Sequence, residues 1–260
     1  MPRVRDLTTP AAGRSLATHL FTLAALAAWE MASRQVPVFL LPGPVPVAQQ
    51  LWALLTTAAG LAQVSASLLH VAAALACAFL VGTLVALLPY YVRGLRFAID
   101  RRLTPFLNAF PGIGWTLLAI LWLGLGLKTV IFAVGIILVP FMIINIREGV
   151  RTVDRDLLEM AASFGANRWR EFALIVLPSL LPFMFSAVRV SFGVAWKVTL
   201  TAELFGGNAG VGYLLNVARQ EFDTDTIFAV ILFIMLFVAA TEVFLFRPLE
   251  RRLDRRYSVE

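Results

Sequence analysis

The sequence predicts an all-α, polytopic membrane protein with about six transmembrane helices and a range of five to seven. Of its 260 residues, 60% are hydrophobic and 15% are charged, whereas about a quarter of an average soluble protein is charged. Long apolar runs such as VAAALACAFLVGTLVALL show no alternation of polar and apolar residues, so helices and not barrel strands must satisfy the backbone in lipid. We therefore expect residues 1–260 to form a single transmembrane domain.

Six stretches of the chain fit the length of a membrane span. A transmembrane helix needs about 20 mainly apolar residues to cross roughly 30 Å of hydrocarbon. The stretches that meet this requirement are residues 15–33, 67–92, 103–127, 129–146, 172–204 and 226–246. The basic residues before the first stretch resemble the opening of a signal peptide, but no small-residue cleavage site follows. Residues 15–33 are therefore expected to be retained as the first span.

Two segments beside or within these spans carry helix-breaking residues. Closely spaced prolines follow the first span, and the pattern from 45 to 57 then becomes amphipathic, which predicts a short helix at the outer, periplasmic membrane interface. The third span carries Pro105, Pro111, Gly112 and Gly114 near its start. A helix broken at this point fits either close packing through small residues or the lining of a transport pathway.

Arginine and lysine are distributed unevenly between the two sides of this topology. With the N-terminus in the cytoplasm, 17 of the 22 basic residues lie in cytoplasmic segments. Arg34, Lys128 and Arg219 lie outside, and Arg189 and Lys197 fall within the fifth span. Because basic residues concentrate on the cytoplasmic side of membrane proteins, both termini are expected there. The same arginines explain the isoelectric point of about 10.2, so no nucleic-acid partner is expected.

The sequence contains none of the residue constellations that indicate an enzyme or a metal site. Cys77 is the one cysteine, and His19 and His70 each stand alone in apolar surroundings, where packing is their expected role. The GLGLKT stretch at 124–129 lacks the residue spacing of an ATP-binding loop. We expect no catalytic residue, no bound metal and no cofactor in this chain.

A polar segment, EMAASFGANRWREFALIVLP at residues 159–178, interrupts the apolar chain. From Asp154 to Phe164 the spacing is that of an amphipathic helix. Gly165 can end that helix, and Asn167 can cap a second one that leads to Pro178 at the foot of the fifth span. From the residues alone, the segment is either a docking element for a cytoplasmic partner or a helix that only connects two spans.

This segment resembles the EAA signature of permease subunits in bacterial ABC importers, the binding-protein-dependent transport inner-membrane component family. The pattern E-x-A-x-x-x-G-x9-I-x-L-P falls on Glu159, Ala161, Gly165, Ile175, Leu177 and Pro178. Met160 departs from it, because the signature usually has a second alanine there. The segments LPGPVPVAQQLWALL, RLTPFLNAFPGIGWTLLAILWLGLG and AVRVSFGVAWKVTLTAELFGGNAGVGYLL are similar to the nitrate, sulfonate and taurine branch, and the likeness covers most of residues 40–250.

The resemblance implies a permease subunit of the bacterial cytoplasmic (inner) membrane that performs no covalent chemistry itself. It implies as partners a second permease copy, expected to form a homodimer, two ATPase subunits that bind ATP and Mg²⁺, and an extracytoplasmic substrate-binding protein. Residues 154–178 are then the cytoplasmic coupling segment, with Glu159, Ala161, Gly165, Arg168, Leu177 and Pro178 as ATPase-coupling residues. The implied solute is a small anion such as a sulfonate, nitrate, taurine or a carboxylate.

Charged residues near the fifth span are the candidates for the translocation pathway. The candidates are Arg189, Trp196, Lys197 and Glu203, the last at the end of the span. Arg189 and Lys197 are separated by about 80° around a helix, so both can face the same side. A charge at the centre of a span costs about 2.5 to 3.5 kcal/mol, so these side chains should face protein or water. Arg189 is expected in an internal ion pair, whereas Lys197 is either ion-paired or a counter-charge for an anionic solute.

The main alternative is an ion-coupled secondary transporter. In that case Glu30, Glu203 and Glu242 are the carboxylates that would couple ion movement to solute movement. Such a transporter needs no docking helix, so the segment at 154–178 favours the ABC importer.

Overall fold

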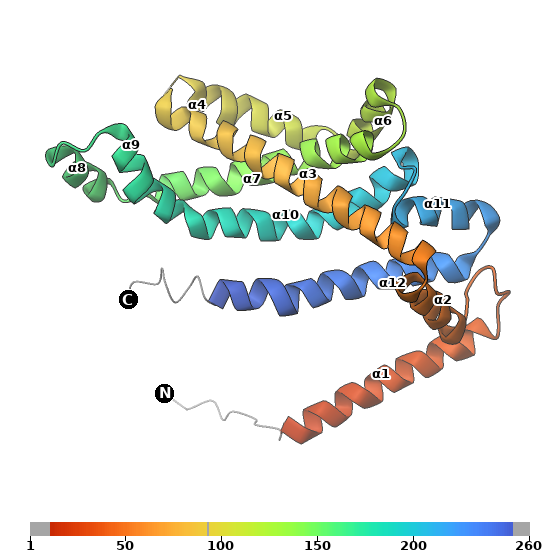
Figure 1. The fold of residues 1–260 in the computed structure, drawn as a ribbon. Coiled ribbons are helices and arrows are strands. Elements are labelled where there is room, and N and C mark those ends of the chain that lie inside the picture. Colours follow the sequence, from red (N-terminus) through yellow and green to blue (C-terminus); the bar gives the residue numbers. More distant parts are fainter. Residues whose placement is uncertain (1–10, 93, 252–260) are drawn as a thin grey trace.

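Long helices cross the molecule and short helices connect them at its two ends (Figure 1). The computed structural model describes residues 11–92 and 94–251, and within these ranges every regular element is a helix. The α-helices are α1 (Ala11–Ser33), α2 (Pro44–Thr56), α3 (Ala58–Tyr91), α4 (Leu95–Ala98), α5 (Thr104–Ala109), α6 (Gly112–Leu123), α7 (Leu127–Thr152), α8 (Arg155–Ser163), α9 (Arg168–Glu171), α10 (Leu177–Gly206), α11 (Val211–Glu221) and α12 (Thr224–Thr241). Helices α4, α8 and α9 lie at one end of the bundle, and α2 and α11 lie at the other.

Helix α7 is the central helix of the bundle and contacts α3, α10, α6 and α5. Helix α3 approaches it through a stripe of small, buried residues at every fourth position, which are Ala74, Ala78, Gly82 and Ala86. Gly82 makes the closest approach, because a Cβ added there would lie only 2.4 Å from the Cβ of Met142. Lipid tails are as apolar as the helix surfaces, so close backbone contact of this kind supplies the van der Waals packing that holds membrane helices together.

Four helical stretches are long and apolar enough to cross a membrane, namely Ala58–Tyr91, Leu127–Thr152, Arg168–Gly206 and Thr224–Arg251. The pair Leu95–Ala109 and Gly112–Leu123, bent by 83°, makes a fifth if it is counted as one span. The predicted count of six is therefore not confirmed within the described residues. The predicted span 15–33 forms most of α1, but α1 is not among these stretches, and it carries His19 and Glu30 within its apolar sequence.

The 83° bend falls where the third predicted span carries its prolines and glycines. Phe110 and Pro111 have extended backbones, with ψ angles of 127° and 136°, and α6 begins at Gly112. The Phe110 ring packs on Trp115 with centroids 4.7 Å apart, and a Cβ on Gly114 would come within 2.7 Å of that ring. At Gly114, therefore, the small residue serves close packing, which is the first of the two interpretations given above.

Helix α1 lies along the side of the bundle, and α2 follows it at one end (Figure 1). Trp29 of α1 donates a hydrogen bond from Nε1 to the carbonyl of Pro42 at 2.9 Å, and its ring stacks on Phe228 of α12. Helix α2 is the short helix predicted at 45–57, and it buries Val47 and Leu54 against the bundle. It packs on α12 and α3 and so closes one end of the bundle.

Three π-helical segments interrupt the helices, and each one ends two residues before a proline. They are η1 (Ile99–Leu103), η2 (Phe172–Val176) and η3 (Glu242–Phe246), and the prolines are Pro105, Pro178 and Pro248. A proline ring clashes with the carbonyl four residues earlier and donates no hydrogen bond. In each case that earlier residue is the middle residue of the π segment, so the wider turn accommodates the ring without ending the helix.

Replacing Gly82 with alanine is expected to destabilise the protein by about 1 to 3 kcal/mol, because the new methyl group overpacks the contact between α3 and α7. Thermal unfolding in detergent should show a lower Tm than for the parent chain. Gly94→Ala is the matched control, since a Cβ on Gly94 meets no atom within 4 Å. Equal Tm values for Gly82→Ala and Gly94→Ala would contradict the close packing of the two helices.

Candidate functional site

The coupling segment predicted from the sequence is a pair of short helices joined by a tight turn. The Asp154 carboxylate caps α8 by accepting a hydrogen bond from the backbone N–H of Asp156 at 2.9 Å. Gly165 follows α8 with a φ of +73°, a left-handed conformation that favours glycine. Asn167 then caps α9 by accepting from the backbone N–H of Arg170 at 2.8 Å. The glycine turn and the asparagine cap predicted from the sequence are thus confirmed.

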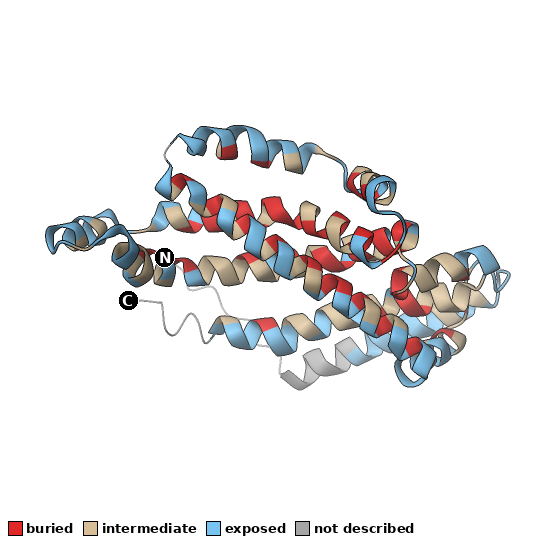
Figure 2. Ribbon diagram, turned by 45° about the horizontal axis from the view of Figure 1, so that its top comes forward, coloured by how far each residue is buried: buried red, intermediate tan, exposed pale blue. Residues whose placement is uncertain are grey.

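This helix pair projects from the end of the bundle, and none of its residues is buried (Figure 2). Its larger apolar side chains are also uncovered: Leu157, Met160, Phe164 and Trp169 are 42% to 84% exposed. The first three share one face of the amphipathic helix at helical spacing. The Glu159 side chain is exposed as well, on the polar side of α8. An apolar face that the chain's own bundle leaves open, in a segment capped at both helix starts, is typical of a docking surface.

The base of the coupling segment is attached to the end of α3. The Tyr90 hydroxyl donates a hydrogen bond to the Glu171 carboxylate. The Phe172 ring lies between 6.0 and 6.2 Å, centroid to centroid, from Tyr90, Tyr91 and Trp169. From Arg168 the helix continues through η2, Leu177 and Pro178 to Gly206 without a break. Helices α9 and α10 are therefore parts of one continuous helical stretch.

The four predicted pathway residues are not brought together in one site. Trp196 is 1% exposed and packs against Phe237 and Phe233 of α12, with ring centroids 4.9 and 6.4 Å away. Arg189 forms the expected internal ion pair, with Glu242 and Glu250 as its partners. Lys197 is exposed, and no ion pair involves it within residues 11–92 and 94–251.

Glu203 lies in a fully buried hydrogen-bond network between α3, α10 and the start of α11. Its carboxylate accepts from the Ser67 hydroxyl at 2.8 Å, from the Gly212 backbone N–H at 2.8 Å, and from His70 Nδ1 at 2.6 Å. Ser67 in turn accepts from the Val211 N–H at 2.8 Å. Every polar contact of the carboxylate is thus made inside the protein, as a buried polar group requires.

The glycines after α10 allow the chain to approach this carboxylate. Gly210 has a φ of +108°, and a Cβ added to it would lie 2.3 Å from the carboxyl carbon of Glu203. Its N–H donates to the Gln63 side chain at 2.7 Å. A side chain at this position would therefore displace the carboxylate or the loop.

His70 is the functional candidate that the sequence prediction missed. It was expected to stand alone as a packing residue, but it contacts Glu203 directly and is 2% exposed. Gln63, Ser67 and His70 recur at helical spacing on one face of α3. That polar stripe in an apolar span was the available signal, while its partner lies more than 130 residues away in the sequence.

Glu203→Ala is expected to lower stability by at least about 1 to 3 kcal/mol, because it leaves the Ser67, His70 and Gly212 donors buried without an acceptor. Thermal unfolding of the purified chain in detergent measures the effect. Glu221→Ala, at an exposed position, is the control and should leave Tm nearly unchanged. A Tm for Glu203→Ala equal to that of the control would show that the network contributes nothing to stability.

Two permease proteins of transport systems are similar to this chain along almost its whole length. The riboflavin transport system permease protein of Chloroflexus aurantiacus is 33% identical over 98% of this chain and 94% of its own length. The taurine transport system permease protein of Escherichia coli is 28% identical over 92% of this chain and 90% of its own. The second of these bears out the resemblance to the taurine branch.

Two solved structures share the fold at low sequence identity. A chain of a bacterial alginate ABC transporter, solved with an alginate pentasaccharide-bound periplasmic protein, matches with a TM-score of 0.61 at 14% identity, over 94% of this chain and 93% of that one. A chain of the inward-facing MetNI methionine ABC transporter matches with a TM-score of 0.60 at 14% identity, over 80% and 95% of the two chains. At this identity the likeness establishes the fold alone.

A family profile described as the binding-protein-dependent transport system inner membrane component matches residues 78–259. This range includes the coupling segment, the central helix α7 and the Glu203 carboxylate. The chain therefore belongs to the binding-protein-dependent transport system inner membrane component family, and it is a transport component of the membrane and not an enzyme.

Proposed function

We propose that this chain is the permease subunit of an ATP-driven importer that moves a small organic or inorganic anion. The observation that carries the proposal is the exposed helix pair α8–α9, whose apolar side chains are uncovered and whose second helix continues into the 39-residue stretch Arg168–Gly206. In the proposed complex, two ATPase subunits bind ATP and Mg²⁺, and each receives this helix pair in a groove. A binding protein delivers the solute at the opposite end.

The coupling residues divide between the docking face and the joint behind it. Glu159 and Ala161 lie on α8, and Arg168 lies at the start of α9. Gly165 forms the turn between the two helices, and Leu177 and Pro178 begin α10. Closure of the ATPase pair would pull on α8, and the turn would pass that movement into α10. This is how ATP hydrolysis is proposed to switch the pathway between its two openings.

In the proposed homodimer, an exposed face of α10 lies opposite the same face of the second copy. Val190, Lys197, Thr201 and Phe205 are all exposed and share one face of α10. A charged and a hydroxyl side chain on this face suit a water-filled pathway better than lipid. Two copies that face each other across this surface would enclose the solute between two lysines. Because the two lysine side chains are positively charged, the proposed solute is an anion.

The relatives support this class of solute without fixing its identity. One is named for taurine, which carries a sulfonate group, and the other for riboflavin. Lys197 favours the sulfonate, nitrate or carboxylate type, because an ammonium group inside a membrane is stabilised by an opposite charge. Sulfonates such as taurine are therefore the first solutes to test, with riboflavin as the comparison.

The proposed location is the bacterial cytoplasmic membrane, with α8, α9 and both termini on the cytoplasmic side. The bias of 17 basic residues to that side supports this orientation. The ion-coupled alternative receives no support from the carboxylates on which it depends. Glu30 pairs with Arg34, Glu242 pairs with Arg189, and Glu203 is enclosed in its own network.

Gly165→Val is expected to weaken ATPase binding and to lower solute-stimulated ATP hydrolysis at least about tenfold. A β-branched residue in the left-handed region is strained by roughly 1 to 2 kcal/mol or more and would change the angle between α8 and α9. The measurement is co-purification with the ATPase and hydrolysis in proteoliposomes. Gly94→Val is the control, because Gly94 has a negative φ and open space around it. Wild-type coupling in Gly165→Val would remove the main support for the proposed docking turn.

Lys197→Met is expected to abolish uptake of the anionic solute while the permease and ATPase still assemble. Uptake of radiolabelled taurine and alkanesulfonates into proteoliposomes measures the effect, with riboflavin tested in parallel. Lys128→Met, which removes an exposed lysine at the start of α7, is the matched control. Uptake kinetics that do not change in Lys197→Met would rule out the counter-charge role, and transport of riboflavin without sulfonates would contradict the proposed class of solute.

A further inference from the structure

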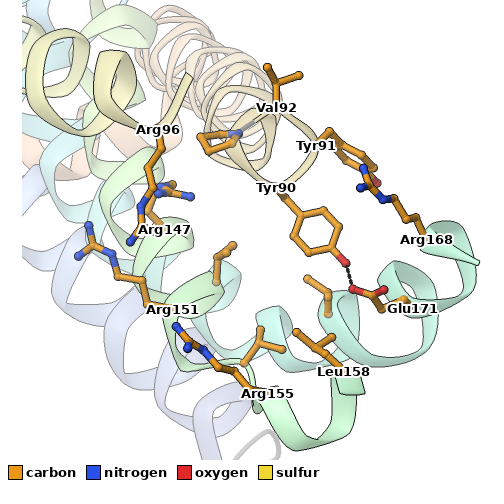
Figure 3. A pocket seen from close by; sticks show the side chains of 14 residues that line it. Tyr90, Tyr91, Val92, Arg96, Arg147, Arg151, Arg155, Leu158, Arg168 and Glu171 are labelled. Atoms are coloured by element: carbon orange, nitrogen blue, oxygen red, sulfur yellow. Dashed lines mark hydrogen bonds between the residues drawn. The ribbon is translucent and has the colours of Figure 1, made fainter. Parts of the chain in front are cut away.

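A cavity of about 1190 Å³ opens at the end of the bundle between α3, α4, α7, α8 and α9 (Figure 3). Its charged lining consists of Arg96, Arg147, Arg151, Arg155, Arg168 and Glu171. Arg96, Arg147, Arg151 and Arg155 lie along one side of the opening, and Arg168 and Glu171 lie on the other, next to Tyr90. Five arginines against one glutamate give the lining a formal charge of +4.

The carboxylates around the cavity neutralise only part of this charge. Asp100 holds Arg147 through two hydrogen bonds of 2.8 and 2.9 Å. The same carboxylate is 3.5 Å from Arg151 and 3.8 Å from Arg96, so three guanidinium groups share it, and Arg151 also pairs with Glu148 at 3.4 Å. Within the described ranges no ion pair involves Arg155 or Arg168. These two arginines, one on each side of the opening, are available to an anion.

The walls of the cavity add apolar surface and place it at the level of the membrane surface. Pro89, Val150, Val153 and Val176 line it between the arginines. Three candidate spans end or begin around it, at Tyr91, Thr152 and Arg168. The aromatic cluster formed by Tyr90, Tyr91, Trp169 and Phe172 lies at the same level, and such residues concentrate at membrane interfaces.

We infer that this cavity binds the head group of an anionic phospholipid. Its phosphate would lie between Arg155 and Arg168, and the apolar wall would accept the start of the acyl chains. Basic pockets between helices on the cytoplasmic side of membrane proteins bind acidic lipids in this way. The volume also exceeds what a single inorganic anion fills. The bound lipid would link α8 and α9 to the ends of α3 and α7, where the Tyr90 to Glu171 hydrogen bond is otherwise the main polar connection.

The test is phosphatidylglycerol binding to the purified chain in neutral detergent, without the ATPase. Native mass spectrometry and the shift in Tm report binding, with phosphatidylcholine and inorganic phosphate as comparison probes. Phosphatidylglycerol is expected to bind and to raise Tm, and the other two are not. In Arg155→Gln/Arg168→Gln its affinity is expected to fall about 30-fold, which corresponds to the usual contribution of two arginines at an acidic lipid surface.

Arg170→Gln/Arg251→Gln is the matched control, since it removes the same charge from exposed positions at the same end of the bundle but outside the cavity. It should bind the lipid as the parent chain does. An equal loss in this control would assign the effect to general surface charge and overturn the proposal. Stabilisation by inorganic phosphate that matches phosphatidylglycerol would identify a free anion as the ligand and also overturn it. Because no ATPase is present, neither result depends on the coupling role proposed above.

Discussion

A carboxylate buried inside a membrane protein must find all of its hydrogen-bond donors within the protein, and Glu203 imposes this requirement on the fold. Ser67 and His70 of α3 and the backbone of Gly212 supply the donors. Removing the carboxylate would leave several buried donors without an acceptor, and each such donor costs about 1 to 3 kcal/mol. The register between α3 and α10 and the path of the loop into α11 are therefore fixed together at one point.

The opposite end of α10 is held in a different way. There the helix continues through η2 into α9 and is attached to α3 by aromatic packing and the Tyr90 hydroxyl. The stretch from Arg168 to Gly206 has 39 residues, or about 58 Å at 1.5 Å per residue. One end is thus locked into a buried network and the other carries an exposed, jointed helix pair. In the proposed importer, this arrangement lets a movement made at the ATPase reach the far side of the membrane through one rigid element.

Local patterns could be predicted from the sequence, and long-range partners could not. The cap at Asn167 and the turn at Gly165 depend on residues a few positions apart, and the structure confirms them. The contact between His70 and Glu203 joins two apolar spans, and nothing in either span specifies the other. The same limit applies to Trp196, whose place in the aromatic core depends on α12. The helix at residues 15–33 was predicted correctly from its apolar sequence. Its helical structure alone, however, does not make it one of the helices that qualify as membrane spans.

The proline that follows each π-helical segment affects how the helices on either side of that segment are rotated. The clearest case is η2, which lies between α9 and α10. A π turn contains one residue more than expected, so the helix beyond it is rotated by about 100° relative to an uninterrupted α-helix. A helical wheel drawn from α9 into α10 would therefore assign the wrong faces to one of the two helices. The direction in which α9 presents its side chains is set by the ring of Pro178, and not by the face on which α10 packs in the bundle.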